Sequence, residues 1–196
     1  YPFIAGVVGW VDLASPDVES VLRSMKSNPL YKGVRPLHDD NKKIHWMNDT
    51  ANEIGFRALI DIGLSFDALI QDFNELPCII SVAERFPKLS IILNHLGKPD
   101  IANNIFASWA ADIDRLAKHP NVVCKFSGIL NQAKAGWSLK GLRPYADHVL
   151  RCFGAERLMW GSDWPPARLT AEYNVGWEVA HELLAHLPAA DQEMIF

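Results

Sequence analysis

Six short apolar runs, each followed by a stretch with helical periodicity, constrain the fold of this chain more than any other feature of its sequence. Apolar runs of this length that end at turn signals are typical of buried strands. Strands that alternate with helices of about 10 to 15 residues favour an α/β fold with a parallel sheet and right-handed crossovers. The predicted strands cover residues 7–13, 32–37, 64–70, 90–96, 122–127 and 157–161. No low-complexity linker interrupts the alternation, so we expect a single domain over residues 1–196.

Six such units fit either a (β/α)8 barrel or an open doubly wound sheet. A doubly wound sheet that binds a nucleotide normally has a glycine-rich first turn. The turn after the first predicted strand, DLASP at 12–16, has no such pattern. Polar residues stand instead at the strand ends, which suits a barrel with its site at one rim. These residues are Asp12, Arg35, Asp67, His95, Lys125 and Asp163. We therefore expect an incomplete (β/α)8, TIM-barrel-like fold with about six βα units and no nucleotide cofactor.

Two of these strand ends carry the residue types that a hydrolytic site needs. Asp163 follows an apolar run and precedes Pro165, and His95 follows another apolar run and precedes Gly97. Ligands of α/β proteins bind at the carboxyl ends of such strands, and imidazole and carboxylate groups serve in acid–base catalysis. Each residue taken alone has a structural alternative: Asp163 as a turn or N-cap residue, and His95 as a hydrogen-bonded core histidine. Together they predict a catalytic pair.

Composition excludes several classes of partner. The chain of 196 residues is 49% hydrophobic with a formal net charge of −4. It has no apolar run near the roughly 18 residues of a membrane span, and no stripe of Lys and Arg that would indicate nucleic acid. The three cysteines lie in apolar patterns without metal-type spacing, which favours free thiols in a reducing compartment. We expect a cytoplasmic protein with buried Cys78, Cys124 and Cys152 and no membrane or nucleic-acid partner.

Five sequence blocks in a fixed order resemble one branch of the amidohydrolase superfamily. They are GWVDL at 9–13, KGVR at 32–35, NHLGKP at 94–99, CKFSG at 124–128 and GSDWP at 161–165. The branch contains sugar-acid lactonases and is similar to 2-pyrone-4,6-dicarboxylate lactonase. The resemblance implies a metal-dependent-hydrolase (β/α)8 barrel in which His95 ends the sixth strand and Asp163, the catalytic aspartate, ends the eighth.

The resemblance also implies that the chain starts at the third strand of such a barrel. The family begins with a strand that ends in a His-x-His pair, and none of the seven histidines here forms one. We favour two explanations for the missing strands: the gene product is truncated or mis-started, or the termini are not included in the chain. A shortened protein that closes its open sheet edges as a homo-oligomer is the alternative. His95 and Asp163 would be the ligands of a divalent metal, zinc or manganese, held weakly by two groups.

Hydrolysis of a small lactone or cyclic ester, most plausibly of a sugar acid, is the function that these groups predict. Asp163 would act as general base on water and His95 would polarise the carbonyl group. The predicted substrate-binding residues are Arg35, Lys98, Lys125 and Trp164. Structural alternatives remain for three of them: an ion pair of Arg35 with Asp12 or Asp67, a salt bridge of Lys125, and packing of Trp164 against the rim.

Two other functions remain open at this point. One is non-oxidative decarboxylation, as in a related amidohydrolase branch that uses a strand-end His and Asp on conjugated acids. The other is a non-catalytic, truncated barrel. The loop at residues 131–138 is a candidate cover for the site.

Overall fold

Six parallel strands form one sheet in chain order. The computed structural model describes residues 2–35, 46–133 and 135–196. Each strand pairs with the next along the chain, and β1 and β6 are the outer strands. The strands are β1 (Val7–Gly9), β2 (Tyr31–Val34), β3 (Ser65–Ala68), β4 (Ile91–Leu93), β5 (Val122–Phe126) and β6 (Leu158–Trp160). All six predicted strands are confirmed, and each is shorter than its predicted range. Residues 36–37 of the second prediction lie outside the described residues.

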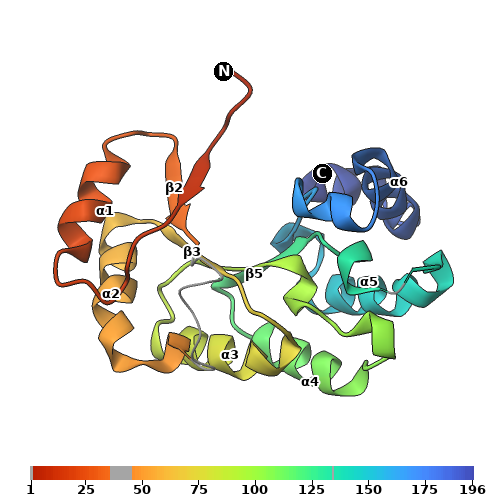
Figure 1. Ribbon diagram of the computed structural model, residues 1–196, viewed down its shortest axis with the longest axis horizontal. Coiled ribbons are helices and arrows are strands. Elements are labelled where there is room, and N and C mark those ends of the chain that lie inside the picture. Colours follow the sequence, from red (N-terminus) through yellow and green to blue (C-terminus); the bar gives the residue numbers. More distant parts are fainter. Residues whose placement is uncertain (1, 36–45, 134) are drawn as a thin grey trace.

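Helices follow the strands and cover the outer face of the curled sheet (Figure 1). The seven in the described ranges are α1 (Val18–Lys26), α2 (Glu53–Ile62), α3 (Leu76–Arg85), α4 (Ala107–Leu116), α5 (Leu139–Phe153), α6 (Tyr173–Leu184) and α7 (Ala189–Ile195). Neighbouring helices also pack side by side, as α1 does on α2 and α3 on α4. The sheet and its helices form a half-barrel, so the prediction of an incomplete TIM-barrel-like fold is confirmed.

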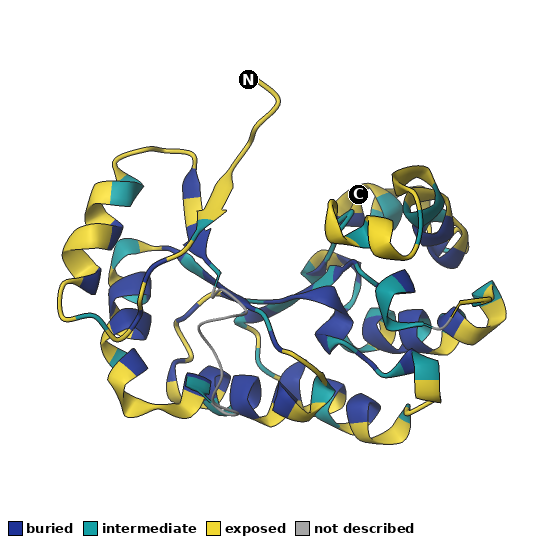
Figure 2. Cartoon of the chain, in the orientation of Figure 1, coloured by how far each residue is buried: buried dark blue, intermediate teal, exposed yellow. Residues whose placement is uncertain are grey.

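The core lies between the sheet and this layer of helices (Figure 2). Phe66 on β3 packs edge-on against Phe56 on α2, with the ring centroids 5.1 Å apart. Trp109 on α4 is fully buried and donates a hydrogen bond to the Leu96 carbonyl at 2.9 Å. Buried aromatic pairs of this kind contribute about 0.5–1.5 kcal/mol beyond the area they bury. They fix the helices to the sheet and thereby fix the strand ends.

The prediction of three buried, free cysteines is confirmed in part. All three are free thiols; Cys78 and Cys124 are buried and Cys152 is half-buried. Among the described residues, no helix is long and apolar enough to cross a membrane.

Candidate active site

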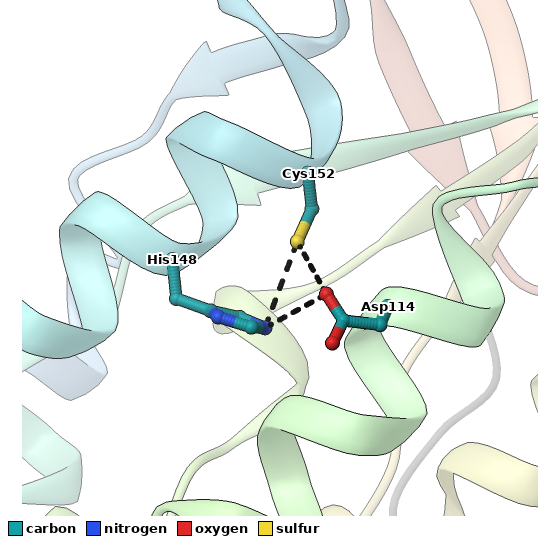
Figure 3. A group of neighbouring side chains, drawn as sticks. All are labelled: Asp114, His148 and Cys152. Atoms are coloured by element: carbon teal, nitrogen blue, oxygen red, sulfur yellow. Dashed lines mark hydrogen bonds and ion pairs between the residues drawn. The ribbon is translucent and has the colours of Figure 1, made fainter.

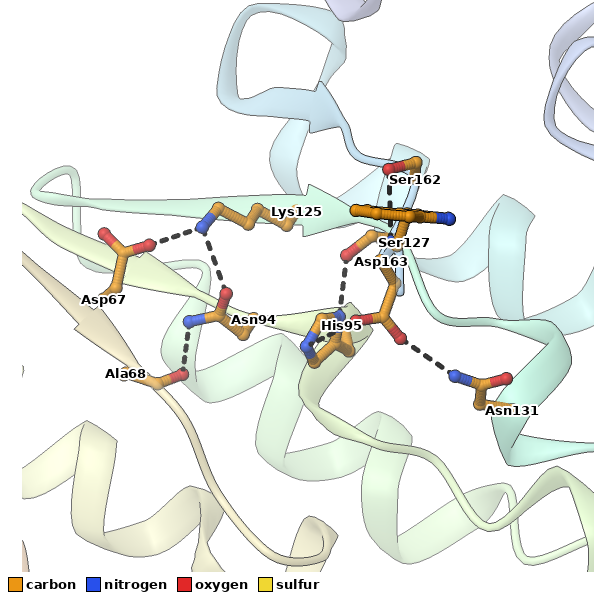
Figure 4. Close-up of polar contacts among 10 residues, drawn as sticks. Asp67, Ala68, Asn94, His95, Lys125, Ser127, Asn131, Ser162 and Asp163 are labelled. Atoms are coloured by element: carbon orange, nitrogen blue, oxygen red, sulfur yellow. Dashed lines mark hydrogen bonds and ion pairs between the residues drawn. The ribbon is translucent and has the colours of Figure 1, made fainter. Parts of the chain in front are cut away.

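His95 and Asp163 lie together at the carboxyl end of the sheet (Figure 4). Residue 95 closely follows β4 and residue 163 closely follows β6, with β5 between them. Because the register of parallel pairing places Leu93 beside Cys124 and Phe126 beside Trp160, the ends of these three strands meet at one edge. His95 Nε2 is 3.5 Å from Asp163 Oδ1, and the two side chains are only 9% and 11% exposed. The structure thus brings together the pair that the sequence singled out.

The backbone at both strand ends is strained. His95 and Leu96 have φ of 53°, Lys98 has 47° and Asp163 has 54°. Only one further non-glycine residue of the described part, Asn104, has a positive φ. Each such residue costs about 1–3 kcal/mol and persists only where the surrounding structure enforces it, most often at functional sites. Strain concentrated at these two strand ends therefore supports a functional role for them.

Three residues that follow β5 complete the site, and none of them was predicted as a partner of His95 or Asp163. Ser127 Oγ is 2.9 Å from His95 Nδ1, and Asn131 Nδ2 donates a hydrogen bond to Asp163 Oδ2 at 2.9 Å. Gly128 has φ of 63°, and a Cβ atom there would lie 3.0 Å from Asp163 Oδ2 and 3.1 Å from His95 Nδ1. Ser127 and Gly128 stand in the CKFSG block, which was a usable signal. Asn131 lies in the loop predicted to cover the site, with no signal of its own.

Burial sets the charges of the pair. The pKa of His95 is lowered to about 3, first by burial and then by the positive charges of Arg35, Lys98 and Lys125. The pKa of Asp163 is raised by burial, while Arg35, the hydrogen bond from Asn131 and Lys98 oppose the rise.

At neutral pH the imidazole is therefore uncharged, and its contact with Asp163 is not an ion pair. A carboxylate facing Nε2 favours the tautomer that carries its proton there. The Ser127 hydroxyl group then donates its hydrogen bond to Nδ1.

Arg35 and Lys98 place two positive charges around the pair. Both act on the pKa of Asp163. The structural alternative for Arg35, an ion pair with Asp12 or Asp67, is not found within the described ranges, where Asp67 pairs with Lys125 and Asp12 Oδ1 accepts from the Ala14 amide. Lys98 likewise has no carboxylate partner in that part of the chain. The substrate-binding role of both cations stays a prediction.

Lys125 already has buried partners. Its ammonium group forms an ion pair with Asp67, which is fully buried, and lies 3.1 Å from Asn94 Oδ1. Asn94 in turn donates to the Ala68 carbonyl at 3.1 Å, so the network ties β3, β4 and β5 together (Figure 4). The structure realises the salt-bridge alternative, and a role of Lys125 in substrate binding stays a prediction.

Trp164 is 60% exposed, next to Asp163. Its backbone amide donates to Ser162 Oγ at 3.2 Å. An indole that is mostly exposed fits stacking on a ligand better than packing against the rim. A small pocket of about 40 Å³ lies next to Ser127 and Asn131, the partners of the pair, and Trp160 and Tyr173 also line it.

Comparison with known proteins decides the family. A family model described as amidohydrolase matches residues 2–196. This chain belongs to the amidohydrolase family. The resemblance found in the sequence blocks is therefore confirmed, over almost the whole of the chain.

Named relatives and solved structures agree with this assignment. The chain is 39% identical over 171 residues to an L-fucono-1,5-lactonase of Burkholderia ambifaria, and the matched region is 87% of this chain and 59% of that protein. An L-fucono-1,5-lactonase of Burkholderia multivorans is 31% identical over 87% of this chain and 61% of its own length. A crystal structure of a B. multivorans amidohydrolase with bound zinc superposes with a TM-score of 0.89 at 29% identity, covering 97% of this chain and 70% of that one. The chain spans about three fifths of the length of these two curated lactonases.

The fit of a divalent metal to the site can be tested on its donor atoms. His95 Nε2 and Asp163 Oδ1 are 3.5 Å apart, close to the roughly 3.4 Å that separates a nitrogen and an oxygen ligand of one tetrahedral zinc. Catalytic zinc uses three protein ligands, however. Within the described ranges, the one group of three or more His, Cys, Asp or Glu donors lies elsewhere, at Asp114, His148 and Cys152. The described residues therefore bring two donors of a possible metal to this site, His95 and Asp163.

Proposed function

We propose that this amidohydrolase opens the lactone ring of a sugar acid by adding water. The observation that carries the proposal is the 3.5 Å approach of His95 Nε2 to Asp163 Oδ1 at the carboxyl end of the sheet. Burial lowers the pKa of His95 and raises that of Asp163, and the charges of Arg35 and Lys98 act on both. A carboxylate whose pKa is raised is a stronger base than one in water, and a neutral imidazole can donate a hydrogen bond without giving up its proton. The two L-fucono-1,5-lactonase relatives support the same reaction.

The reaction follows from where the protons lie. Asp163 takes a proton from water as the water oxygen forms a bond to the ring carbonyl carbon. The Nε2–H group of His95 donates to the carbonyl oxygen, which gains negative charge, and the cations of Arg35 and Lys98 stabilise that charge further. When the ring C–O bond breaks, Asp163 returns its proton to the leaving alkoxide. The product is the open hydroxy acid, which releases one proton to solvent at neutral pH.

The small pocket next to Ser127 and Asn131 offers groups that can contact part of a polyhydroxylated ring. Asn131 Oδ1 is buried and has no hydrogen-bond partner among the described residues, so it can accept from a substrate hydroxyl group. Trp160 and Tyr173 contribute aromatic surface to the same lining. Sugars combine an apolar ring face with hydroxyl donors, which this lining matches. These features favour a sugar lactone over an unsubstituted cyclic ester.

The test is a proton-release assay on a panel of sugar-acid 1,4- and 1,5-lactones and pyrone dicarboxylates. Asp163→Asn keeps the shape of the side chain and removes the base, so we expect a fall in kcat of at least 100-fold. Asp61→Asn is the matched control, because Asp61 is an exposed carboxylate on α2. It should leave the rate unchanged.

Three results would overturn the proposal. They are full activity in the Asp163→Asn variant, no hydrolysis of any lactone by the folded chain, and release of carbon dioxide in place of a proton, which would indicate the decarboxylase. Zinc and manganese are added in parallel, since His95 and Asp163 would be their ligands. A hydrolysis rate that rises at micromolar metal would indicate that a metal ion binds His95 and Asp163 together with further ligands during the reaction.

A further inference from the structure

A second cluster of side chains, Asp114, His148 and Cys152, lies away from the strand-end site, where α4 packs on α5 (Figure 3). His148 and Cys152 are four residues apart on α5 and therefore share one face of that helix. Asp114 reaches the same point from α4. Sequence spacing showed no metal motif because the third group comes from a different helix. We propose that this cluster is a binding site for a zinc-type divalent cation that links α4 to α5.

The distances between the three donor atoms match those around one zinc ion. Cys152 Sγ is 3.6 Å from His148 Nε2 and 3.1 Å from Asp114 Oδ1, and His148 Nε2 is 3.5 Å from Asp114 Oδ1. Standard zinc bond lengths at a tetrahedral angle give about 3.6 Å for sulfur to nitrogen or oxygen and about 3.4 Å for nitrogen to oxygen. Only the Cys152–Asp114 separation would have to widen, by about half an ångström. Asp114 can supply that movement, because its side chain is 55% exposed.

Charge and solvent access also suit a divalent cation. A thiolate and a carboxylate together neutralise two positive charges, so the buried end of the site would not hold a net charge. His148 is almost fully buried between Phe106 and Trp109, which holds its ring in place. The exposed side of Asp114 leaves room for water as the fourth ligand. On binding, the thiol proton of Cys152 leaves to solvent, and the imidazole proton that faces the Ala110 carbonyl moves to Nδ1.

Arg151 opposes binding. Its Nη2 atom lies 2.6 Å from His148 Nδ1, to which it donates a hydrogen bond. A metal-bound imidazole carries its proton on Nδ1, and a donor cannot remain in front of that proton. The exposed Arg151 side chain must therefore swing away before an ion binds. This competition predicts that Arg151→Gln binds the ion about tenfold more tightly, because it removes a charge-assisted hydrogen bond and supplies an acceptor.

The test is a titration of the full chain with Co²⁺, read by the thiolate-to-cobalt charge-transfer absorption. We expect a signal with a dissociation constant on the order of 1 µM for the unchanged chain. Cys152→Ser should abolish the signal, and Asp114→Asn should weaken binding at least tenfold. Asp114 is exposed, so the second variant is expected to fold normally even if the first does not. A double variant, Cys78→Ser with Cys124→Ser, is the matched control and should keep the signal.

The readout is independent of the hydrolytic reaction. The strand-end pair contains no thiol, so cobalt bound at His95 and Asp163 would give no thiolate band. The site does not exist if the unchanged chain shows no band at 1 mM Co²⁺, or if the band survives in Cys152→Ser. A band of equal affinity in Asp114→Asn would remove the carboxylate from the proposal and overturn it as well.

Discussion

Replacement of Gly128 by alanine tests the close approach that defines the site. A Cβ atom at this position would lie 3.0 Å from Asp163 Oδ2 and 3.1 Å from His95 Nδ1, so both side chains must move by a few tenths of an ångström. The positive φ of 63° adds backbone strain of about 1–2 kcal/mol. Overpacking at such contacts adds about 1–3 kcal/mol. We expect Gly128→Ala to lose roughly 2–5 kcal/mol of stability.

Gly63→Ala is the matched control. Gly63 has φ of 73°, and a Cβ atom there would meet nothing within 4 Å, so this variant carries the backbone strain alone. It should lose about 1–2 kcal/mol, which lowers Tm by about 2–8 °C in a chain of this size, and it should keep full lactone hydrolysis.

In Gly128→Ala, kcat/KM should also fall on the order of tenfold, since displacing catalytic groups by 1 Å costs about 100-fold. Thermal unfolding and the proton-release assay measure the two effects. Equal losses of Tm in the two variants, with activity kept in Gly128→Ala, would refute the contact geometry.

Three further substitutions probe charge and hydrogen bonding. Asn131→Ala removes a hydrogen-bond donor that favours the ionised form of Asp163, so the pKa of Asp163 should rise. The acid limb of the pH profile of kcat/KM should then move to higher pH. An unmoved limb would show that Asn131 does not set the pKa of the catalytic base. His95 stays neutral in the folded state down to a pKa of about 3 but takes up a proton near 6.5 when unfolded, so stability should fall as pH drops below 6.5, by about 2 kcal/mol at pH 5. Urea titrations of His95→Gln should lack this component. Lys125→Met leaves Asp67 as an unpaired buried carboxylate and should lower the free energy of unfolding by about 3–5 kcal/mol. The double variant with Asp67→Asn should restore part of that stability. No loss of stability in Lys125→Met would mean that the ion pair is not structural.

The sequence predicted the strands well because buried strands carry a local signal. Their ends were less predictable, as at β4, where the prediction ran to residue 96 and the strand stops at Leu93. The segment His95–Gly97 forms a turn with positive φ at residues that are not all glycine. Long-range contacts enforce that conformation, so the local pattern does not contain it.

The pairing of side chains across the sheet was predicted in part. His95 and Asp163 could be paired because both follow strands of one repeated series. The sequence assigned Arg35 and Lys125 the same role, yet Lys125 pairs with Asp67 and Arg35 does not. Which cation meets which carboxylate depends on the direction of each side chain on a curved sheet. Asn131 is 32 residues from its partner Asp163, and no local pattern links the two.

The left-handed backbone at His95 and Asp163 limits which residues can replace them during evolution or in a mutant library. Aspartate, asparagine and histidine are several-fold enriched in this conformation, whereas β-branched residues are outliers there. A valine at residue 163 would therefore fail through the main chain as well as through the loss of the carboxylate. Asparagine loses only the carboxylate. Mutational tolerance measured at these two positions will thus combine two selections, one for conformation and one for chemistry, and asparagine is the substitution that separates them.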